Sequence, residues 1–309
     1  MDTTDKKVCL ITGGSGFVGN ALAQQLISSG YTVYSLDDYS TSKTHESFSH
    51  FQKCPGTLEL TLNSIHYIQG HTSEIATKCC HVSPDIIFHF GEYSRINQSW
   101  SECDKVMKSN LYGTSCVLDY CLKKKALLVY SASSAILGET IQRTPYTFTK
   151  KVMVDLIKRY HEWFGLQYII TYFYNVYGEG QISNGPYATV LGIFEKQYSE
   201  GKSLTVVKPG TQSRCFTHIN DIINGILTAI STFENADVPI CSKDFITIEN
   251  LARLFSDTIE YLPERQGDRE SSKLELPDIL RQIGWESSVN LMDYIKDIKN
   301  KLLSLRHTK

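Results

Sequence analysis

The chain has 309 residues, of which 41% are hydrophobic and 21% charged, and its net charge is −2. This is the composition of a packed globular protein, and a charge near zero argues against a nucleic-acid-binding surface. No apolar run approaches the length of a membrane span, and the first strand-like segment begins too early for a leader peptide, so we expect a cytoplasmic protein without membrane contact. The nine cysteines form no CxxC pair and the nine histidines no HExxH pair, so we predict reduced thiols and no metal.

The first half of the chain alternates short apolar runs with helical patterns. Continuous apolar strands that alternate with helices are typical of a parallel, doubly wound α/β sheet. The predicted strands are Val8–Thr12, Thr32–Leu36, Ile65–Gln69, Asp85–Phe90, Ala126–Ser131 and Tyr168–Tyr172. The predicted helices are Val18–Ser28, Val106–Leu122 and Thr147–Phe164.

Beyond Gly178 the pattern loosens and glycine and proline become frequent, which predicts a smaller α/β lobe beside the carboxyl ends of the strands. Its predicted strands are Leu204–Val207 and Phe245–Ile248, and its predicted helices are Ile248–Tyr261 and Val289–Leu303. We assign residues 1–175 to the sheet domain, with 216–241 returning to it, and residues 176–215 and 242–309 to the substrate lobe.

A glycine-rich turn, Thr12–Gly19, follows the first strand and opens the first helix. Gly13, Gly16 and Gly19 permit a tight turn and close approach of the backbone to a pyrophosphate, which the helix N-terminus attracts. This placement indicates a dinucleotide site of the Rossmann type, with Phe17 and Val18 beside it.

The second strand ends in Asp37-Asp38, near the distance expected for a ribose-binding carboxylate. A carboxylate at Asp37 accepts hydrogen bonds from ribose hydroxyls and repels a 2′-phosphate, so NAD is favoured over NADP. Lys43 leaves a phosphate contact as the alternative.

Tyr146 and Lys150 lie four residues apart in a predicted helix and therefore share one face. The lysine ammonium and the positive nicotinamide both stabilise a phenolate, which makes Tyr146 an acid–base group. Ser133 follows the strand Ala126–Ser131, where such sheets carry their chemistry, and can relay a proton between a substrate oxygen and Tyr146.

At this point the sequence resembles the extended short-chain dehydrogenase/reductases, in particular their nucleotide-sugar epimerase/dehydratase branch. The resemblance runs from about Val8 to Trp285. Its motifs are Thr12–Gly19, Asp37 with Ser42 and Lys43, Ile87–Phe90, Asn110–Thr114, Tyr130–Gly138, Tyr146 with Lys150, Asn175–Gly178, Arg214–Asp221 and Arg265–Asp268.

The resemblance implies a role for each matching residue. The implied catalytic residues are Ser133, Tyr146 and Lys150. The implied NAD contacts are Gly13, Gly16, Phe17, Val18, Gly19, Asp37, Asp38, Ser42, Lys43, Phe90, Gly91, Asn110, Ser131, Tyr146, Lys150 and Tyr172. The implied contacts of a nucleotide sugar, with a UDP-sugar favoured, are Glu92, Ser133, Tyr146, Asn175, Arg214 and Arg265. Charged guanidinium forks suit phosphate oxygens, which agrees with the last two.

Several positions depart from the branch. Ser134 and Ala135 stand where its dehydratases carry an Asp-Glu pair. At Ala135 its decarboxylases carry a Glu and its deoxysugar epimerase-reductases a Cys. These reactions are therefore disfavoured. Glu92 and Arg95 stand where small residues are usual, and they either read the sugar or pair with each other.

Three further departures concern the rims of the site. His71 replaces the Asp that meets adenine, and the Gly138–Tyr146 connection is short. Ser272 stands at the position that gates an N-acetyl group and leaves room for one.

What remains is chemistry that needs only a hydride and one proton relay. We therefore expect an NAD-dependent epimerase that inverts C4 of a UDP-hexose or UDP-N-acetylhexosamine through a transient 4-keto sugar. The alternatives are a 4-ketoreductase or dehydrogenase with net redox, and a non-catalytic NAD-binding protein. The resemblance also implies a homodimer through the helices Val106–Leu122 and Thr147–Phe164.

Overall fold

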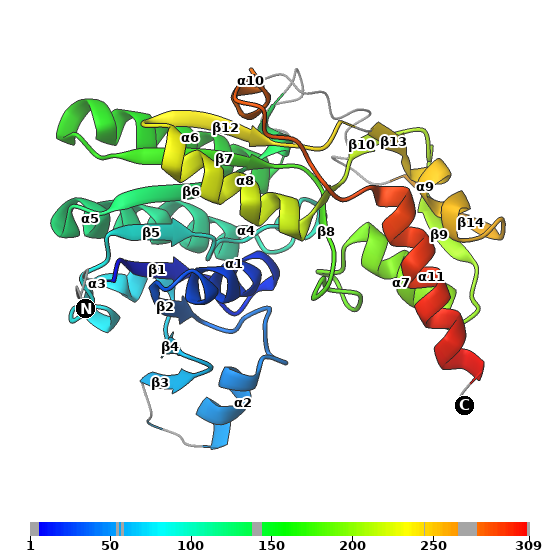
Figure 1. The fold of residues 1–309 in the computed structure, drawn as a ribbon, viewed down its shortest axis with the longest axis horizontal. Coiled ribbons are helices and arrows are strands. Elements are labelled where there is room, and N and C mark those ends of the chain that lie inside the picture. The colour runs from blue at the N-terminus through cyan, green and yellow to red at the C-terminus, as the bar shows by residue number, and fades with distance from the viewer. Residues whose placement is uncertain are drawn as a thin grey trace.

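The computed structural model describes residues 6–53, 56, 59–137, 144–243, 245–264 and 277–307. The largest feature of this part is an eight-stranded sheet of order β12-β7-β6-β5-β1-β2-β4-β3 (Figure 1). Neighbouring strands run parallel except for β3 and β4. The predicted Rossmann-type, doubly wound α/β fold is therefore confirmed. The strands are β1 (Val8–Thr12), β2 (Thr32–Asp37), β3 (Glu59–Leu62), β4 (Ile65–Gln69), β5 (Ile86–His89), β6 (Leu127–Ser133), β7 (Tyr168–Phe173) and β12 (Ala236–Ile240).

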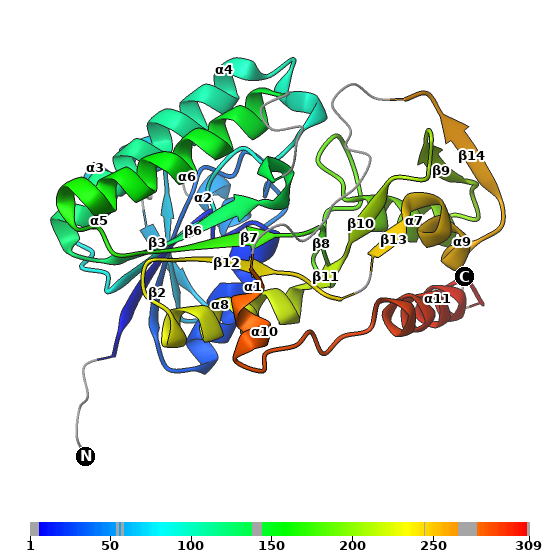
Figure 2. The ribbon, with the colours of Figure 1, turned by 90° about the horizontal axis from the view of Figure 1, so that it is seen from above.

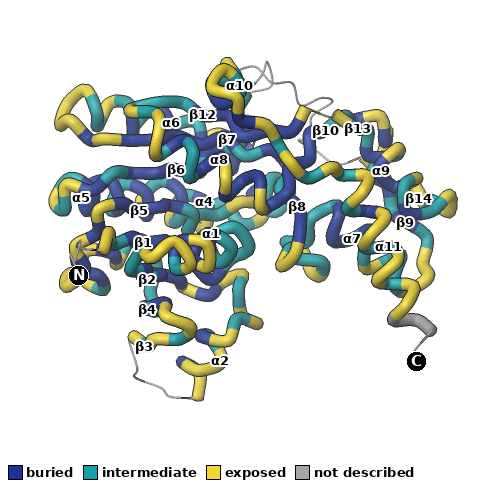
Figure 3. Tube along the Cα trace, viewed as in Figure 1, coloured by how far each residue is buried: buried dark blue, intermediate teal, exposed yellow. Residues whose placement is uncertain are grey.

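Helices cover both faces of this sheet, because its central strands are apolar on both sides (Figure 2). Helices α1 (Phe17–Ser28) and α8 (Ile219–Thr232) pack on one face, while α5 (Thr114–Lys124) and α6 (Pro145–Phe164) pack on the other. The strands are buried along most of their length, and exposed residues gather on the outer helices and on the edge formed by β3 and α2 (Figure 3). The short helices here are α2 (Glu46–Lys53), α3 (Ile75–Lys78), α4 (Cys103–Val106) and α10 (Ile279–Gln282).

The predicted helix Val106–Leu122 is helical along its length, but its first half is not a regular α-helix. Residues Met107–Gly113 form a π-helical stretch between α4 and α5. A wider turn of this kind changes the direction in which the following side chains point, and no residue pattern in the sequence marks it.

A smaller lobe stands beside the carboxyl ends of the strands (Figure 1). It has its own apolar core, with Phe194, Val206, Leu251 and Phe255 at its centre. Its helices are α7 (Val190–Ser199), α9 (Ile248–Phe255) and α11 (Leu291–His307), and its strand pairs are β8 (Val176–Tyr177) with β11 (Thr217–His218), β10 (Ser213–Cys215) with β13 (Phe245–Thr247), and β9 (Leu204–Val207) with β14 (Ile259–Leu262).

Two expectations about this lobe are wrong. The predicted helix Ile248–Tyr261 ends at Phe255, and Ile259–Leu262 instead forms a strand that pairs with β9. Part of the range 242–309 also returns to the sheet domain, because Leu280 and Trp285 pack into its core and Trp285 donates a hydrogen bond to Asn224 Oδ1 at 2.7 Å.

Two kinds of feature do not occur among the described residues. No described helix is long and apolar enough to cross a membrane. No group of three or more His, Cys, Asp or Glu side chains within the described ranges is arranged to hold a metal ion.

Candidate active site

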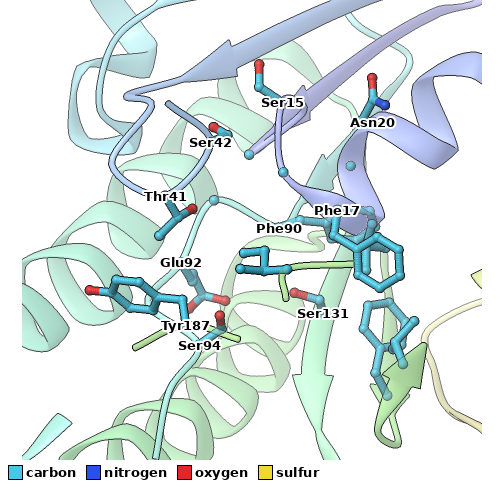
Figure 4. A pocket seen from close by; sticks show the side chains of 18 of the residues that line it. Ser15, Phe17, Asn20, Thr41, Ser42, Phe90, Glu92, Ser94, Ser131 and Tyr187 are labelled. Carbon is cyan, nitrogen blue, oxygen red and sulfur yellow. The ribbon is translucent and has the colours of Figure 1, made fainter. Parts of the chain in front are cut away.

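A cleft of about 1570 Å³ opens at the carboxyl edge of the sheet and extends to the small lobe. β1 and β5 are adjacent there, with Thr12 paired to His89, and the chain leaves these two strands in opposite directions. Such a switch point is where doubly wound sheets bind their ligands. Side chains from several separate segments converge on the cleft, among them Ser15, Glu92, Ser131 and Tyr187 (Figure 4).

The glycine-rich turn forms one end of this cleft. Gly13 has a φ of 71°, and a Cβ atom on it would lie 2.8 Å from the Gly91 nitrogen, so the position requires glycine. Gly16 is the N-cap of α1 and makes no side-chain cap, whereas Thr144, Thr189 and other polar residues cap α6, α7, α8 and α9. The first N–H groups of α1 are therefore left for an anion, which fits the pyrophosphate of a dinucleotide.

Asp37 ends β2 beside this turn, and only 8% of its surface is exposed. Its carboxylate accepts hydrogen bonds from Ser15 N at 2.9 Å, Tyr39 N at 2.7 Å and Ser42 Oγ at 3.2 Å. Burial raises the pKa of Asp37 to about 6, and the two backbone donors oppose that rise. A carboxylate held in this way is ready to accept further hydrogen bonds from ribose hydroxyls.

The three predicted catalytic residues all line the cleft. Helix α6 begins at Pro145 with Thr144 as its cap, which places Tyr146 and Lys150 one turn apart on one buried face. Ser133 ends β6 opposite this helix, and its Oγ accepts a hydrogen bond from Ala135 N at 3.1 Å.

Lys150 has a partner that the sequence did not reveal. Its ammonium donates to the Glu92 carboxylate and, at 2.5 Å, to the carbonyl of Ser131, and it lies 4.7 Å from the centre of the Tyr130 ring. The side chains of Lys150 and Glu92 are only 4% and 1% exposed. Burial raises the pKa of the Glu92 carboxyl above its ordinary value, and the Lys150 ammonium opposes that rise.

The suggested ion pair between Glu92 and Arg95 is wrong. Arg95 instead donates to the Tyr187 carbonyl through Nε at 3.0 Å and Nη2, and to the Ser94 carbonyl at 3.0 Å. Burial lowers the pKa of Arg95, while Tyr146 and Tyr187 oppose that shift. The guanidinium thereby ties the loop around Tyr187 to the segment that follows β5.

Most other predicted contacts also line the cleft, and for these the role in binding stays a prediction. They are Gly13, Gly16, Phe17, Val18, Gly19, Asp37, Asp38, Ser42, Phe90, Gly91 and Ser131 on the cofactor side, and Glu92 and Asn175 on the substrate side.

Four predicted contacts are not among the residues that line the cleft, and their roles in binding stay predictions. Asn110 is fully buried in the π-helical stretch, where it bonds Tyr93 N at 2.7 Å. Tyr172 lies on the opposite face of β7 from Phe173, which lines the cleft, and it donates to Asp237 at 2.7 Å. Lys43 is exposed, and Arg214 donates to the Ser213 carbonyl at 2.8 Å.

Three positions singled out by the sequence lie outside the described residues: Arg265, Ser272 and most of the short connection before Tyr146.

Sequence reasoning missed Thr114, Tyr130 and Tyr187 as residues that shape the site. Thr114 and Tyr130 lie within motifs that the resemblance used, and both donate to Glu92 Oε1, at 3.0 and 3.1 Å. Tyr187 stands in a glycine-containing loop 92 residues from Arg95, and no local pattern identifies it.

Comparison with known proteins agrees with this geometry. The chain is 24% identical to the UDP-N-acetyl-alpha-D-glucosaminuronate decarboxylase of Bacillus cytotoxicus, over 96% of this chain and 99% of that one. It is 23% identical to the UDP-glucuronic acid decarboxylase 1 of Danio rerio, over 94% of this chain and 71% of that one.

Two solved structures share the fold. The UDP-glucose 4-epimerase of Thermotoga maritima with UDP-glucose superimposes with a TM-score of 0.84 at 22% identity, over 97% of this chain and 99% of that one. The UDP-glucuronic acid 4-epimerase of Bacillus cereus with UDP-glucuronic acid and NAD gives a TM-score of 0.80 at 22% identity, over 96% and 99%.

The family comparison is decisive for the cofactor. Residues 9–241 match the NAD dependent epimerase/dehydratase family, which covers the glycine turn, the aspartate that ends β2 and the Tyr146–Lys150 pair. The chain therefore belongs to the NAD-dependent epimerase/dehydratase family, and its cofactor is NAD.

Proposed function

We propose that this protein is a nucleotide-sugar epimerase that inverts C4 of a UDP-hexose or a UDP-N-acetylhexosamine. The observation that carries the proposal is the content of the cleft around the triad. Ser133, Tyr146 and Lys150 line it together, while Ser134 and Ala135, which follow the serine and also line it, supply neither a carboxyl nor a thiol. The site thus holds one proton relay without a second acid or base at that position.

The residues of this chain would act as follows. Bound NAD supplies a reversible hydride acceptor for the sugar carbon. Tyr146, as the phenolate, accepts the proton of the sugar 4-hydroxyl, and the Ser133 hydroxyl orients that oxygen. Lys150 stabilises the phenolate by its charge. Tyr146 then returns the proton to the 4-oxygen after the sugar has turned its other face, so the reaction has no net proton or redox change.

A second candidate is decarboxylation of a UDP-hexuronic acid, because the curated relatives named above carry that activity. The absence of a carboxyl at Ala135 weighs against it. Glu92 is the acidic side chain found near Lys150 in the described cleft, but its carboxylate is engaged by that lysine.

The test is incubation of the purified protein with UDP-glucose, UDP-galactose, their N-acetyl forms and UDP-glucuronic acid, followed by proton NMR of the anomeric signals. We expect the C4 epimer to form without consumption of added cofactor. Release of carbon dioxide and a UDP-pentose from UDP-glucuronic acid would instead establish the decarboxylase. A stoichiometric change in NAD(P)H would establish a reductase or dehydrogenase, and cofactor binding without turnover of any of these sugars would establish a non-catalytic NAD-binding protein.

We also propose that the protein is a cytoplasmic homodimer. Trp100, Tyr112 and Phe148 are 45%, 61% and 39% exposed, and the last two belong to the helical segments expected to pack between subunits. Large exposed apolar side chains on adjacent helices are typical of an interface. Light scattering after gel filtration would show twice the chain mass of 35.0 kDa, and a species of 35.0 kDa would refute the dimer.

A further inference from the structure

The side chain of Glu92 lines the cleft but is only 1% exposed, and its carboxylate forms an ion pair with Lys150, the proposed catalytic lysine. It follows β5, whereas Lys150 lies on α6, 58 residues further along the chain. A buried carboxylate is costly unless it is paired and hydrogen-bonded. Glu92 meets both conditions, because the Lys150 ammonium bonds Oε2 while two hydroxyls bond Oε1.

The hydrogen bonds behind Glu92 run in one direction. Thr114 donates its proton to Glu92, so its oxygen must accept from His89 Nε2, which lies 2.9 Å away. His89 is neutral, because burial and the nearby Lys150 charge lower its pKa to about 3, and Nδ1 then accepts from the Thr12 hydroxyl at 2.7 Å. The Gly91 N–H completes the chain by donating to Thr12 at 3.0 Å.

The direction of these hydrogen bonds indicates whether the Glu92 carboxyl is ionised or protonated. Burial raises the pKa of Tyr130 well above its ordinary value, so this hydroxyl also remains a donor to Glu92. Every hydrogen in the chain from Gly91 onward points toward the same carboxylate. Such aligned donors favour the ionised form of an acid, and each donor in a chain polarises the next.

The Glu92 carboxylate lies among several positive charges, which it balances. Arg95 is a second cation and faces Tyr146, and family membership adds the positive nicotinamide of NAD. Glu92 is the anion in direct contact with the Lys150 ammonium. The titratable groups that face this cluster are Glu92 after β5, His89 on β5 with His71 beyond it, Tyr130 on β6, and Tyr146 on α6.

We infer that Glu92 is a positioning residue whose carboxylate holds Lys150 and offsets part of its charge, so that the ammonium still stabilises the Tyr146 phenolate while the site retains oxidised NAD. The inference rests on the proposed function in so far as Lys150 and Tyr146 serve the hydride chemistry. A sugar epimerase that keeps its cofactor bound benefits from this balance, because an uncompensated ammonium would repel the oxidised, positive nicotinamide and favour the reduced, neutral one.

The experiment compares Glu92→Gln, which removes the charge but keeps the shape, with the wild-type protein. The first readout is the ratio of the Kd for NAD+ to the Kd for NADH, measured by calorimetry between pH 6 and 9 without a sugar. We expect Glu92→Gln to raise this ratio about tenfold, the size of effect that one adjacent charge has on a neighbouring charged group.

The second readout is the pH profile of kcat/KM. An uncompensated Lys150 ammonium stabilises the Tyr146 phenolate more strongly, so the acidic limb of the profile should move by about one pH unit toward lower pH in Glu92→Gln. A purely structural role for Glu92 would lower thermal stability and activity at all pH values and leave both the Kd ratio and the position of the limb unchanged. That result would overturn the inference.

Two further variants keep the test decisive. Glu92→Asp retains the charge but shortens the reach to Lys150, so its Kd ratio should stay within about threefold of wild type, and a tenfold rise would contradict charge balance even if Glu92→Gln did not fold. Glu286→Gln is the matched control. It removes the charge of a carboxylate that pairs with a lysine, Lys243, at the surface and outside the cleft lining, and it should leave the ratio unchanged.

The outcomes separate this inference from the proposed function. If the wild-type protein converts no nucleotide sugar, the proposed function fails, while the Kd ratio still tests Glu92. If the wild-type protein forms the epimer and Glu92→Gln keeps the wild-type ratio and limb, the role of Glu92 fails and the proposed function stands.

Discussion

The two ends of the cleft are built in different ways. The cofactor end consists of backbone held by short-range geometry, with the turn between β1 and α1 and the carboxylate that ends β2. The end near Lys150 consists of side chains brought together from distant segments, such as the Glu92–Lys150 pair and the Arg95–Tyr187 contact. The first end is expected to tolerate changes of side chain except at the glycines and Asp37, whereas the second depends on each partner. Four substitutions test this contrast.

The largest effect is expected at the second end, for Tyr146→Phe. Loss of an acid–base group typically costs about 10²–10⁴ in rate, so epimer formation should fall by about 10³-fold in kcat. NAD affinity should change little, because the aromatic ring stays in place. The measurement is turnover by NMR together with the Kd for NAD by calorimetry, with Tyr112→Phe, 61% exposed, as the matched control. Substantial activity in Tyr146→Phe would remove this residue from the mechanism.

At the cofactor end, the contrast predicts that one methyl group on the backbone is enough to disturb binding. In Gly13→Ala the new Cβ would meet Gly91 N at 2.8 Å and the residue would be strained at a φ of 71°. Such strain costs about 1–3 kcal/mol, so NAD should bind about 10- to 100-fold more weakly. Gly30→Ala is the control, because Gly30 has a φ of 86° with nothing near its Cβ position. Equal loss of NAD affinity in both variants would show a general folding defect.

The side chain at the cofactor end gives a smaller, pH-dependent effect. Since burial raises the pKa of Asp37 to about 6, NAD should bind more weakly as the pH falls through 6 and the carboxylate gains a proton. Asp37→Asn should lower NAD affinity about tenfold at pH 8 and abolish this dependence. An unchanged pH dependence in Asp37→Asn, compared with the exposed control Asp257→Asn, would assign it to another group.

The sign for stability is opposite. The native state binds the Asp37 proton more tightly than the unfolded chain does, so this group makes the cofactor-free protein less stable as the pH rises from about 4 to 6.

The smallest effect is expected for Tyr172→Phe. Tyr172 lies outside the cleft lining and donates to Asp237, so its loss should reduce the free energy of unfolding by about 1 kcal/mol. Urea denaturation measures this change. NAD affinity should remain that of the wild type, and a clear loss would restore Tyr172 to the cofactor site.

The same contrast explains how much the sequence predicts. The bounds of β1, β4 and β9 agree with the apolar runs, since local pattern decides a buried strand. The glycine turn and Asp37 were predictable because their geometry is local. The Glu92–Lys150 pair was not, because it joins segments 58 residues apart and depends on how β5 and α6 meet.

In one other segment, pairing between strands decided the structure against the helical pattern of apolar residues. The residues Ile259–Leu262 continue an apolar pattern that predicted a helix, yet they pair with β9. The helices α7 and α8 were not predicted, although the segment 216–241 was expected to return to the sheet domain.

Asn110 holds the segment after β5 in place, although it lies outside the cleft lining. Its amide bonds both the nitrogen and the carbonyl of Tyr93 and also reaches Thr149, so it fixes the main chain of the segment after β5 from within a helix. The main chain that carries Glu92 and Arg95 is therefore fixed by a residue outside the cleft lining, independently of the contacts that these two side chains make. A single buried amide thus links the segment after β5 to the π-helical stretch and to α6, so the backbone at Tyr93 is held from behind the cleft rather than by a ligand.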